Sequence, residues 1–160
     1  MIDRSVAHGS FSVERTYPAP PTRVFAAWAT QTAKDIWFGE GDDFLAATEQ
    51  YTLDFQVGGR ERLYGTLPGG RAFSYDAIYH DIVDDQRIVA AYDVSIDGRR
   101  TSVSLMTVEF VDVPGGTRVV LTEQGAFLDG LDSNAQREEG ALNSLVKLGQ
   151  YLETQVAPTC

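Results

Sequence analysis

The sequence predicts an α+β domain in which a curved, antiparallel sheet of seven strands packs against a long C-terminal helix. Three observations lead to this fold class. The hydrophobic period is two from Tyr51 to Gln124, it is close to 3.6 near the C-terminus, and turn residues divide the region of period two into short segments. A chain of 160 residues fits a single core. We therefore expect one domain over residues 1–160, in the order βααββββββα.

The N-terminal part changes from strand to helix at a cluster of prolines. Residues 1–9 show no period and are predicted to be a flexible lead-in, whereas residues 10–17 alternate and predict the first strand. The segment Pro18-Ala19-Pro20-Pro21 ends this strand and can begin a helix, because proline is tolerated in the first helical turn. Two short helices and a loop are predicted to follow, over residues 22–29, 32–38 and 39–43.

Six further strands are predicted between turns that contain glycine, proline or aspartate. The pair Asp97-Gly98 is a strong signal for a two-residue hairpin. Tight turns between consecutive strands imply an antiparallel meander, to which the first strand adds a seventh member. The predicted strands cover residues 51–55, 60–67, 72–83, 87–96, 101–113 and 117–124.

The last segment returns to the helical period. Residues Ser133 to Gln136 have the spacing of a capping box, in which side chains satisfy the free backbone N–H groups of the first turn. A single helix about 10 Å wide cannot cover a wide, curled sheet completely. The remaining space is predicted to be filled by large side chains or left as an internal cavity. The apolar stripe of this helix consists of Leu142, Leu145, Leu148, Leu152 and Val156.

Composition excludes several classes of partner and chemistry. The net charge of −10 disfavours nucleic acid and anionic membrane surfaces, and no apolar run reaches the roughly 18 residues that cross a bilayer. The N-terminus does not resemble a signal peptide, and the single cysteine, Cys160, excludes an internal disulfide, so we expect a cytoplasmic protein. Two separated histidines, one cysteine and the lack of phosphate-binding or dinucleotide motifs predict no metal and no cofactor.

Five short segments carry a resemblance that spans residues 11–153. Over this range the chain resembles the START-like (SRPBCC) superfamily and, more narrowly, the family of the C-terminal domain of the activator of Hsp90 ATPase. The resemblance implies a helix-grip (START/Bet v 1-like) fold with a pocket between the sheet and the C-terminal helix. The segments are Arg15-Thr16-Tyr17-Pro18-Ala19-Pro20, then Val24-Phe25-Ala26-Ala27-Trp28 with Trp37, then Phe55-Gln56-Val57-Gly58-Gly59-Arg60, then Gly116 to Gln124, and finally Gly140, Leu145, Leu148, Tyr151 and Leu152.

The sequence departs from the family pattern in the closing helix. Family members usually have a tryptophan directly after the helix glycine, whereas here Ala141 follows Gly140. The missing indole implies a larger cavity, or one that another aromatic side chain fills. The eukaryotic activator also has an additional N-terminal domain that these 160 residues do not include.

Two titratable residues are candidates for chemistry in the pocket. His80 lies within the predicted sheet, and histidine is the natural acid–base group near neutral pH. Alternation puts His80 on the face of Ile78 and Ile82, but both faces of this strand carry apolar residues, so the inward face stays undecided. Glu123 shares the face of Leu121, which is predicted to point inward. It either anchors a polar group in the pocket or reaches solvent at the mouth.

The relatives implied by the resemblance include lipid and hormone carriers, polyketide cyclases and chaperone regulators, so the fold does not fix the function. We predict that the chain binds a small apolar or amphipathic ligand, such as a lipid, without catalysis. Two alternatives stay open: a cyclase-like or hydrolytic enzyme that uses cavity His, Glu and Tyr groups, and an Hsp90-type chaperone-interaction or stress-response module. The predicted ligand-binding residues, any of which can instead be plain core, are Trp28, Trp37, Phe55, Tyr64, Tyr75, Tyr79, Tyr92, Ser104, Met106, Phe110, Leu121, Glu123, Ala141, Leu145 and Gly149.

Overall fold

The structure is a computed structural model that describes residues 4–39 and 45–155. Seven strands form one antiparallel sheet with the neighbour order β1-β7-β6-β5-β4-β3-β2. The strands are β1 (Val6–Tyr17), β2 (Ala47–Leu53), β3 (Arg60–Thr66), β4 (Ala72–Val83), β5 (Arg87–Ile96), β6 (Arg99–Val113) and β7 (Gly116–Leu128). The helices are α1 (Pro21–Ala29), α2 (Gln31–Lys34), the π-helical turn η1 (Asp35–Gly39) and α3 (Asn134–Thr154).

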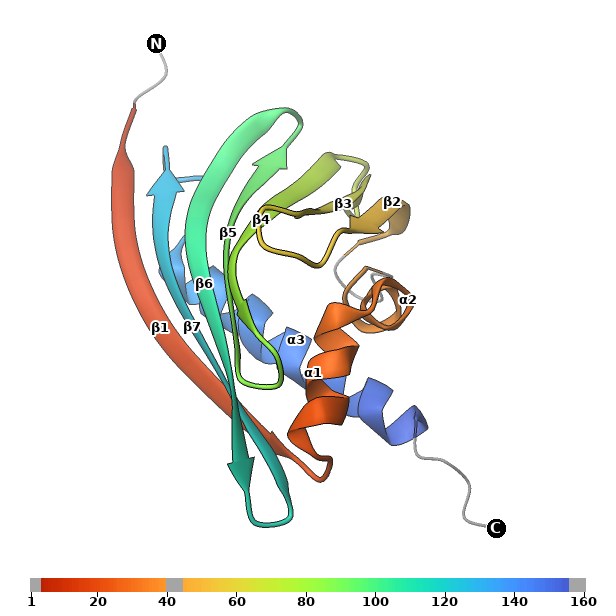
Figure 1. The fold of residues 1–160 in the computed structure, drawn as a ribbon. Helices are drawn as coiled ribbons and strands as arrows, with labels where there is room; N and C mark the ends of the chain where they lie inside the picture. The colour runs from red at the N-terminus through yellow and green to blue at the C-terminus, as the bar shows by residue number, and fades with distance from the viewer. Residues whose placement is uncertain (1–3, 40–44, 156–160) are drawn as a thin grey trace.

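The sheet is strongly bent and wraps around α3, as Figure 1 shows. Helix α3 contacts the edge strand β1 on one side and η1 on the other, and α1 lies beside it. The helix therefore spans the concave face from the first strand toward the α1–α2–η1 segment. The predicted α+β fold, with seven strands in a meander around a long C-terminal helix, is confirmed. That residues 1–160 form a single domain stays a prediction.

Alternation decides which side chains face α3. On β4 the side chains of Phe73, Tyr75 and Tyr79 are buried, and on β5 those of Ile88 and Tyr92 are buried. Ala77 and Ala90 are buried on the same face. The side chains at the alternate positions of both strands are half-buried or exposed, as expected for a sheet with one packed face. The inward face of β4 is thus the odd-numbered one.

Several predicted boundaries were wrong. The predicted lead-in over residues 1–9 fails for residues 6–9, because β1 begins at Val6 and pairs with β7 up to Leu128. This part of β1 lacks a clear period since its side chains are mostly exposed. The predicted strand 51–55 is also misplaced, because β2 spans Ala47–Leu53, and β7 continues four residues beyond Gln124.

The second predicted helix is two short elements. The range 32–38 covers the end of α2 and most of η1, and Gly39, predicted to begin a loop, is the last residue of η1. The rest of that loop lies outside the described residues. Trp37 ties η1 to α1, because its Nε1–H donates to the backbone oxygen of Ala27 at 2.9 Å.

The predicted start of the long helix is correct, and its predicted stripe is correct only in part. The Ser133 hydroxyl accepts a hydrogen bond from the backbone N–H of Gln136 at 3.2 Å, which caps α3. Leu142, however, is 45% exposed, and Ala141 takes its place on the buried face. The buried side chains are Ala141, Leu145, Leu148 and Leu152, and Val156 lies outside the described residues. No helix within residues 4–39 and 45–155 is long and apolar enough to span a membrane.

Candidate functional site

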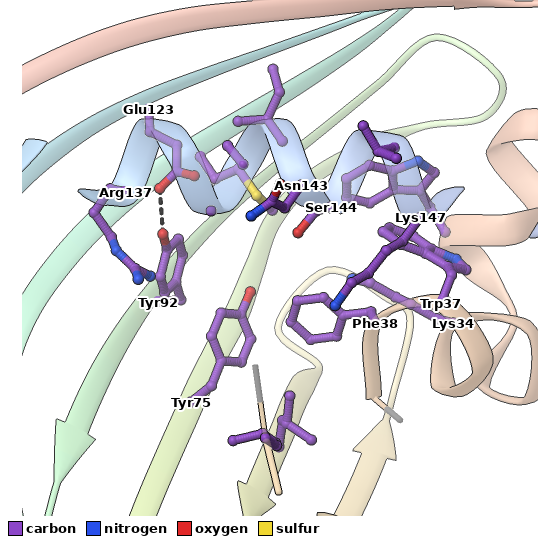
Figure 2. Close-up of a pocket in the computed structure, with 18 of the residues that line it drawn as sticks. Lys34, Trp37, Phe38, Tyr75, Tyr92, Glu123, Arg137, Asn143, Ser144 and Lys147 are labelled. Carbon is purple, nitrogen blue, oxygen red and sulfur yellow. Dashed lines mark hydrogen bonds between the residues drawn. The ribbon is translucent and has the colours of Figure 1, made fainter. Parts of the chain in front are cut away.

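A pocket of about 350 Å³ lies between the sheet, η1 and α3 (Figure 2). This volume falls in the range of sites for small molecules. Aromatic rings form much of its wall, namely those of Trp28, Trp37, Phe38, Phe73, Tyr75 and Tyr92. Charged and polar side chains complete it, namely those of Lys34, Glu123, Arg137, Asn143, Ser144, Lys147 and Gln150.

The structure brings together about half of the residues that the sequence singled out. The predicted residues that line this pocket are Trp28, Trp37, Tyr75, Tyr92, Met106, Leu121, Glu123 and Ala141. They come from α1, η1, four strands of the sheet and α3. All of them lie on the concave side of the sheet. This is why the alternation of apolar and polar side chains along the strands predicted the strand residues among them correctly.

Three of the predicted aromatic residues lie outside the pocket lining: Phe110 and Tyr79 are buried in the core, and the half-buried Phe55 packs against it. Phe55 and Phe110 pack edge-on against Phe25, with ring centroids 5.7 and 5.2 Å away. Tyr79 is buried beside Glu61 and donates to its carboxylate at 2.8 Å. These residues stabilise the wall without forming the surface of the pocket.

Four other predictions also fall outside the lining. Tyr64 lies on the outer face of β3 and donates a hydrogen bond to Asp76. Ser104 and Leu145 are buried in the packed interior. Gly149 faces β1 rather than the pocket, because a Cβ at this position would lie 3.1 Å from the Tyr17 ring. The glycine therefore permits close packing of helix on sheet.

The polar residues of α3 were missed because a helix with a leucine stripe is expected to turn its polar side to solvent. Arg137 and Ser144 lie about one turn on either side of Ala141, so they share its line along the helix. Ala141 was already predicted to line the pocket. Helical spacing from Ala141 would therefore have predicted Arg137 and Ser144 as pocket residues as well. Asn143 and Gln150 are exposed and Lys147 is half-buried, which places them at the mouth.

Glu123 forms one end of the pocket and is only 6% exposed. Its carboxylate accepts a hydrogen bond from the hydroxyl of Tyr92. Burial raises the pKa of Glu123 from its ordinary value of 4.5 to about 7, although the Tyr92 hydrogen bond and the charge of Arg137 partly oppose this. Arg137 itself lies 3.2 Å from a carboxylate oxygen of Asp132. Glu123 can therefore gain or lose a proton near neutral pH.

Tyr75 presents its hydroxyl to the middle of the pocket, as Figure 2 shows. Its ring stacks on that of Tyr92 with centroids 4.7 Å apart. Burial, with the nearby carboxylate of Glu61, raises the pKa of Tyr75 well above its ordinary value. Within the described residues the hydroxyl has no hydrogen-bond partner, so it is available to a ligand or to water.

Behind the aromatic wall lies a buried ion pair. The ammonium of Lys34 is 2.8 and 2.9 Å from the two carboxylate oxygens of Glu61, and both side chains are almost fully buried. Tyr51 and Tyr79 donate hydrogen bonds to the same carboxylate. The ammonium also lies 5.1 Å from the Trp28 ring centroid and is stabilised by that ring. Lys34 therefore reaches the pocket as a neutralised charge.

His80 is exposed on the outer face of β4, where the register of the β4–β5 pair shifts. Glu123 lies in the pocket on the opposite face, so these two residues do not converge on one site. An acid–base pair of His80 and Glu123 is therefore excluded. Among residues 4–39 and 45–155, no three His, Cys, Asp or Glu side chains are grouped to hold a metal ion.

Known proteins share both the sequence and the shape of this chain. An uncharacterised protein from Rhizobium leguminosarum is 42% identical, with a TM-score of 0.90, over 96% of this chain and 99% of its own. The Mll3558 protein from Rhizobium loti is 43% identical, with a TM-score of 0.84, over 92% and 99%. The CV1439 protein from Chromobacterium violaceum is 20% identical, with a TM-score of 0.72 over 90% and 96%, and shows the shared fold alone. No curated protein matches this chain.

The match to a family is direct. The sequence profile of the activator of Hsp90 ATPase homolog 1-like proteins matches residues 18–153, which include the pocket and most of the sheet. The resemblance found from the sequence motifs is confirmed by this match. The chain belongs to the activator of Hsp90 ATPase homolog 1-like family.

Proposed function

We propose that this protein binds a small amphipathic molecule in the pocket between the sheet and α3, and that it does so without catalysis. The observation that carries this proposal is the Tyr75 hydroxyl, which has no hydrogen-bond partner among residues 4–39 and 45–155 and lies inside a pocket of ligand size. Aromatic rings would contact the apolar body of the ligand, and polar groups at the ends would contact its polar atoms. In this family, the fold is compatible with such a role.

The tyrosines of the pocket argue against acid–base catalysis. Burial and nearby carboxylates raise the pKa of Tyr75 and of Tyr92, so neither becomes a base near neutral pH. Glu123 has a pKa of about 7, but its hydrogen bond ties it to Tyr92. Because His80 lies on the other face, the enzyme alternative would have to use Glu123 with protonated tyrosines, and no second base near neutral pH lies among the predicted pocket residues.

Filling the pocket should abolish ligand binding. In Ala141→Trp the indole projects from α3 into the space that Ala141 now borders. We expect the affinity for the neutral fluorescent probe N-phenylnaphthylamine to fall by about tenfold or more, because the probe and the indole compete for the same volume. The measurement is a titration that follows the rise in probe fluorescence.

Leu142→Trp is the matched control, since it adds the same side chain at the next position, which is 45% exposed. It should bind the probe as the unchanged protein does, and both variants should melt cooperatively. Equal affinity of Ala141→Trp and Leu142→Trp would contradict the proposed site. So would a lack of saturable binding by the unchanged protein.

The family match supports a second candidate, a chaperone-interaction module of the cytoplasm. Such a module would act through its outer surface, so its partner and the pocket ligand need not compete. Size-exclusion chromatography of the purified protein with the Hsp90 homologue of the same cell tests this candidate. Co-elution would support it, and separate elution with and without nucleotide would remove it.

A further inference from the structure

The chain contains two lysines, Lys34 and Lys147, and both line the pocket. They are far apart in the sequence, one at the end of α2 and the other in the second half of α3. The whole chain carries a net charge of −10, so the placement of both ammonium groups at one pocket contrasts with its overall charge. This placement bears on the charge of the ligand.

The pocket has two chemically different ends. Glu123 and Tyr92 lie at one end, with Arg137 beside them, whereas both lysines lie toward Phe38 and Trp37 at the other (Figure 2). A ligand anion would be repelled from ionised Glu123 and attracted toward the ammonium of Lys147, whereas Glu61 neutralises the charge of Lys34. An anionic ligand would therefore bind in one orientation.

The two lysines have different depths. Lys34 is 1% exposed and is held by Glu61 and by the Phe38 ring, whose centroid lies 4.9 Å from the ammonium. Lys147 is half-buried at the mouth, near the exposed amides of Asn143 and Gln150. The polar head of an amphipathic ligand stays hydrated most easily at the mouth. Lys147 is therefore placed to contact such a head, while Lys34 forms part of the wall behind it.

We propose that the ligand is an apolar monocarboxylate whose carboxylate binds Lys147 at the mouth and whose apolar body lies on the aromatic wall. This inference rests on the proposed ligand-binding function of the same pocket. A lysine ammonium contributes one compact charge with several donors, which suits a single carboxylate. Asn143 and Gln150 can add amide donors to the same head group.

A pair of probes with the same ring system tests the charge. Naphthoate and naphthamide differ in the charge of the head group and share the apolar body. By isothermal titration calorimetry we expect naphthoate to bind the unchanged protein about tenfold more tightly than naphthamide. In Lys147→Gln the two affinities should become equal, through loss of naphthoate binding alone. In Lys147→Arg the preference should persist, because the charge is retained.

Arg71→Gln is the control for overall charge, since it removes one exposed cation from the turn before β4. It should keep the preference for naphthoate. If the unchanged protein binds naphthamide as tightly as naphthoate, or if Lys147→Gln keeps the preference, the carboxylate assignment is wrong while ligand binding itself stands. If neither probe binds and N-phenylnaphthylamine does not bind either, the proposed function fails as well.

Discussion

Replacing Glu61 with glutamine is expected to lower the free energy of unfolding by about 3–5 kcal/mol, because the change leaves Lys34 as a buried charge without a counter-charge. Glu61 is fully buried and accepts hydrogen bonds from Lys34, Tyr51 and Tyr79. A glutamine keeps the size of the side chain and loses the charge. Urea unfolding at neutral pH, followed by tryptophan fluorescence, measures the difference.

Two further variants test whether the loss of stability comes from the unpaired charge of Lys34 or from the loss of the contacts that Glu61 makes. The double variant Lys34→Met with Glu61→Gln removes both charges and should recover most of the loss, because a buried pair replaced by neutral groups is often close to neutral in stability. Asp81→Asn breaks the exposed ion pair with Arg87 and should cost at most about 1 kcal/mol. A cost for Glu61→Gln no larger than that for Asp81→Asn would show that the buried pair does not stabilise the fold.

Most of the fold could be predicted because its signals are local. Period two and tight turns such as Asp97-Gly98 specify strands without knowledge of distant contacts, and β4 and β5 have the predicted bounds. The first strand was harder, since residues 6–9 pair with β7 while their side chains stay mostly exposed. Pairing of backbone groups at an exposed edge leaves no hydrophobic pattern in the sequence.

The polar half of the site depends on contacts that are distant in the sequence. Lys34 belongs to a short helix near the N-terminus, and a lysine there is expected in solvent, while Ile36 is expected inside. The structure reverses both: Lys34 is 1% exposed and Ile36 is 51% exposed. The reason is Glu61 on β3, whose carboxylate offers the ammonium a buried partner. No local pattern connects these two positions.

Which face of β4 points inward could not be predicted from the sequence, because this too depends on contacts that are distant in the sequence. Tyr75 and Tyr79 alternate with Ile78 and Ile82, so both faces carry large apolar side chains. What fixes the direction is the surroundings: Tyr79 finds the carboxylate of Glu61 inside, and Tyr75 stacks on Tyr92. His80 lies on the opposite face from Tyr75 and Tyr79 and is exposed, so it is not part of the candidate site.

The second large effect is a loss of stability as the pH rises through the titration of Glu123. Burial raises the pKa of Glu123 from 4.5 to about 7 in the folded protein. Below pH 4.5 the carboxyl is protonated in both states and costs nothing. Between pH 4.5 and 7 the unfolded chain releases the proton first, so the folded state binds more protons and stability falls with rising pH. Above pH 7 the full difference, about 3 kcal/mol, is present.

Glu123→Gln should remove this pH dependence, because glutamine is neutral at every pH and its oxygen can still accept the Tyr92 hydrogen bond. We expect the variant and the unchanged protein to have similar unfolding free energies at pH 4.5, and the variant to be more stable by about 3 kcal/mol at pH 8. The other groups near Glu123, which are Tyr92, Arg137 and Asp132, are present in both proteins, so their titration largely cancels in the difference. Urea unfolding over this pH range gives the comparison.

The control is Glu109→Gln on β6, whose carboxylate is exposed and so has no burial penalty to remove. Its difference from the unchanged protein should stay small and flat with pH. A difference for Glu123→Gln that is equally flat would show that Arg137 and Tyr92 stabilise the ionised carboxylate enough to offset its burial. In that case Glu123 would be a permanent anion at the inner end of the pocket, and its repulsion would direct a ligand carboxylate toward Lys147 at any physiological pH.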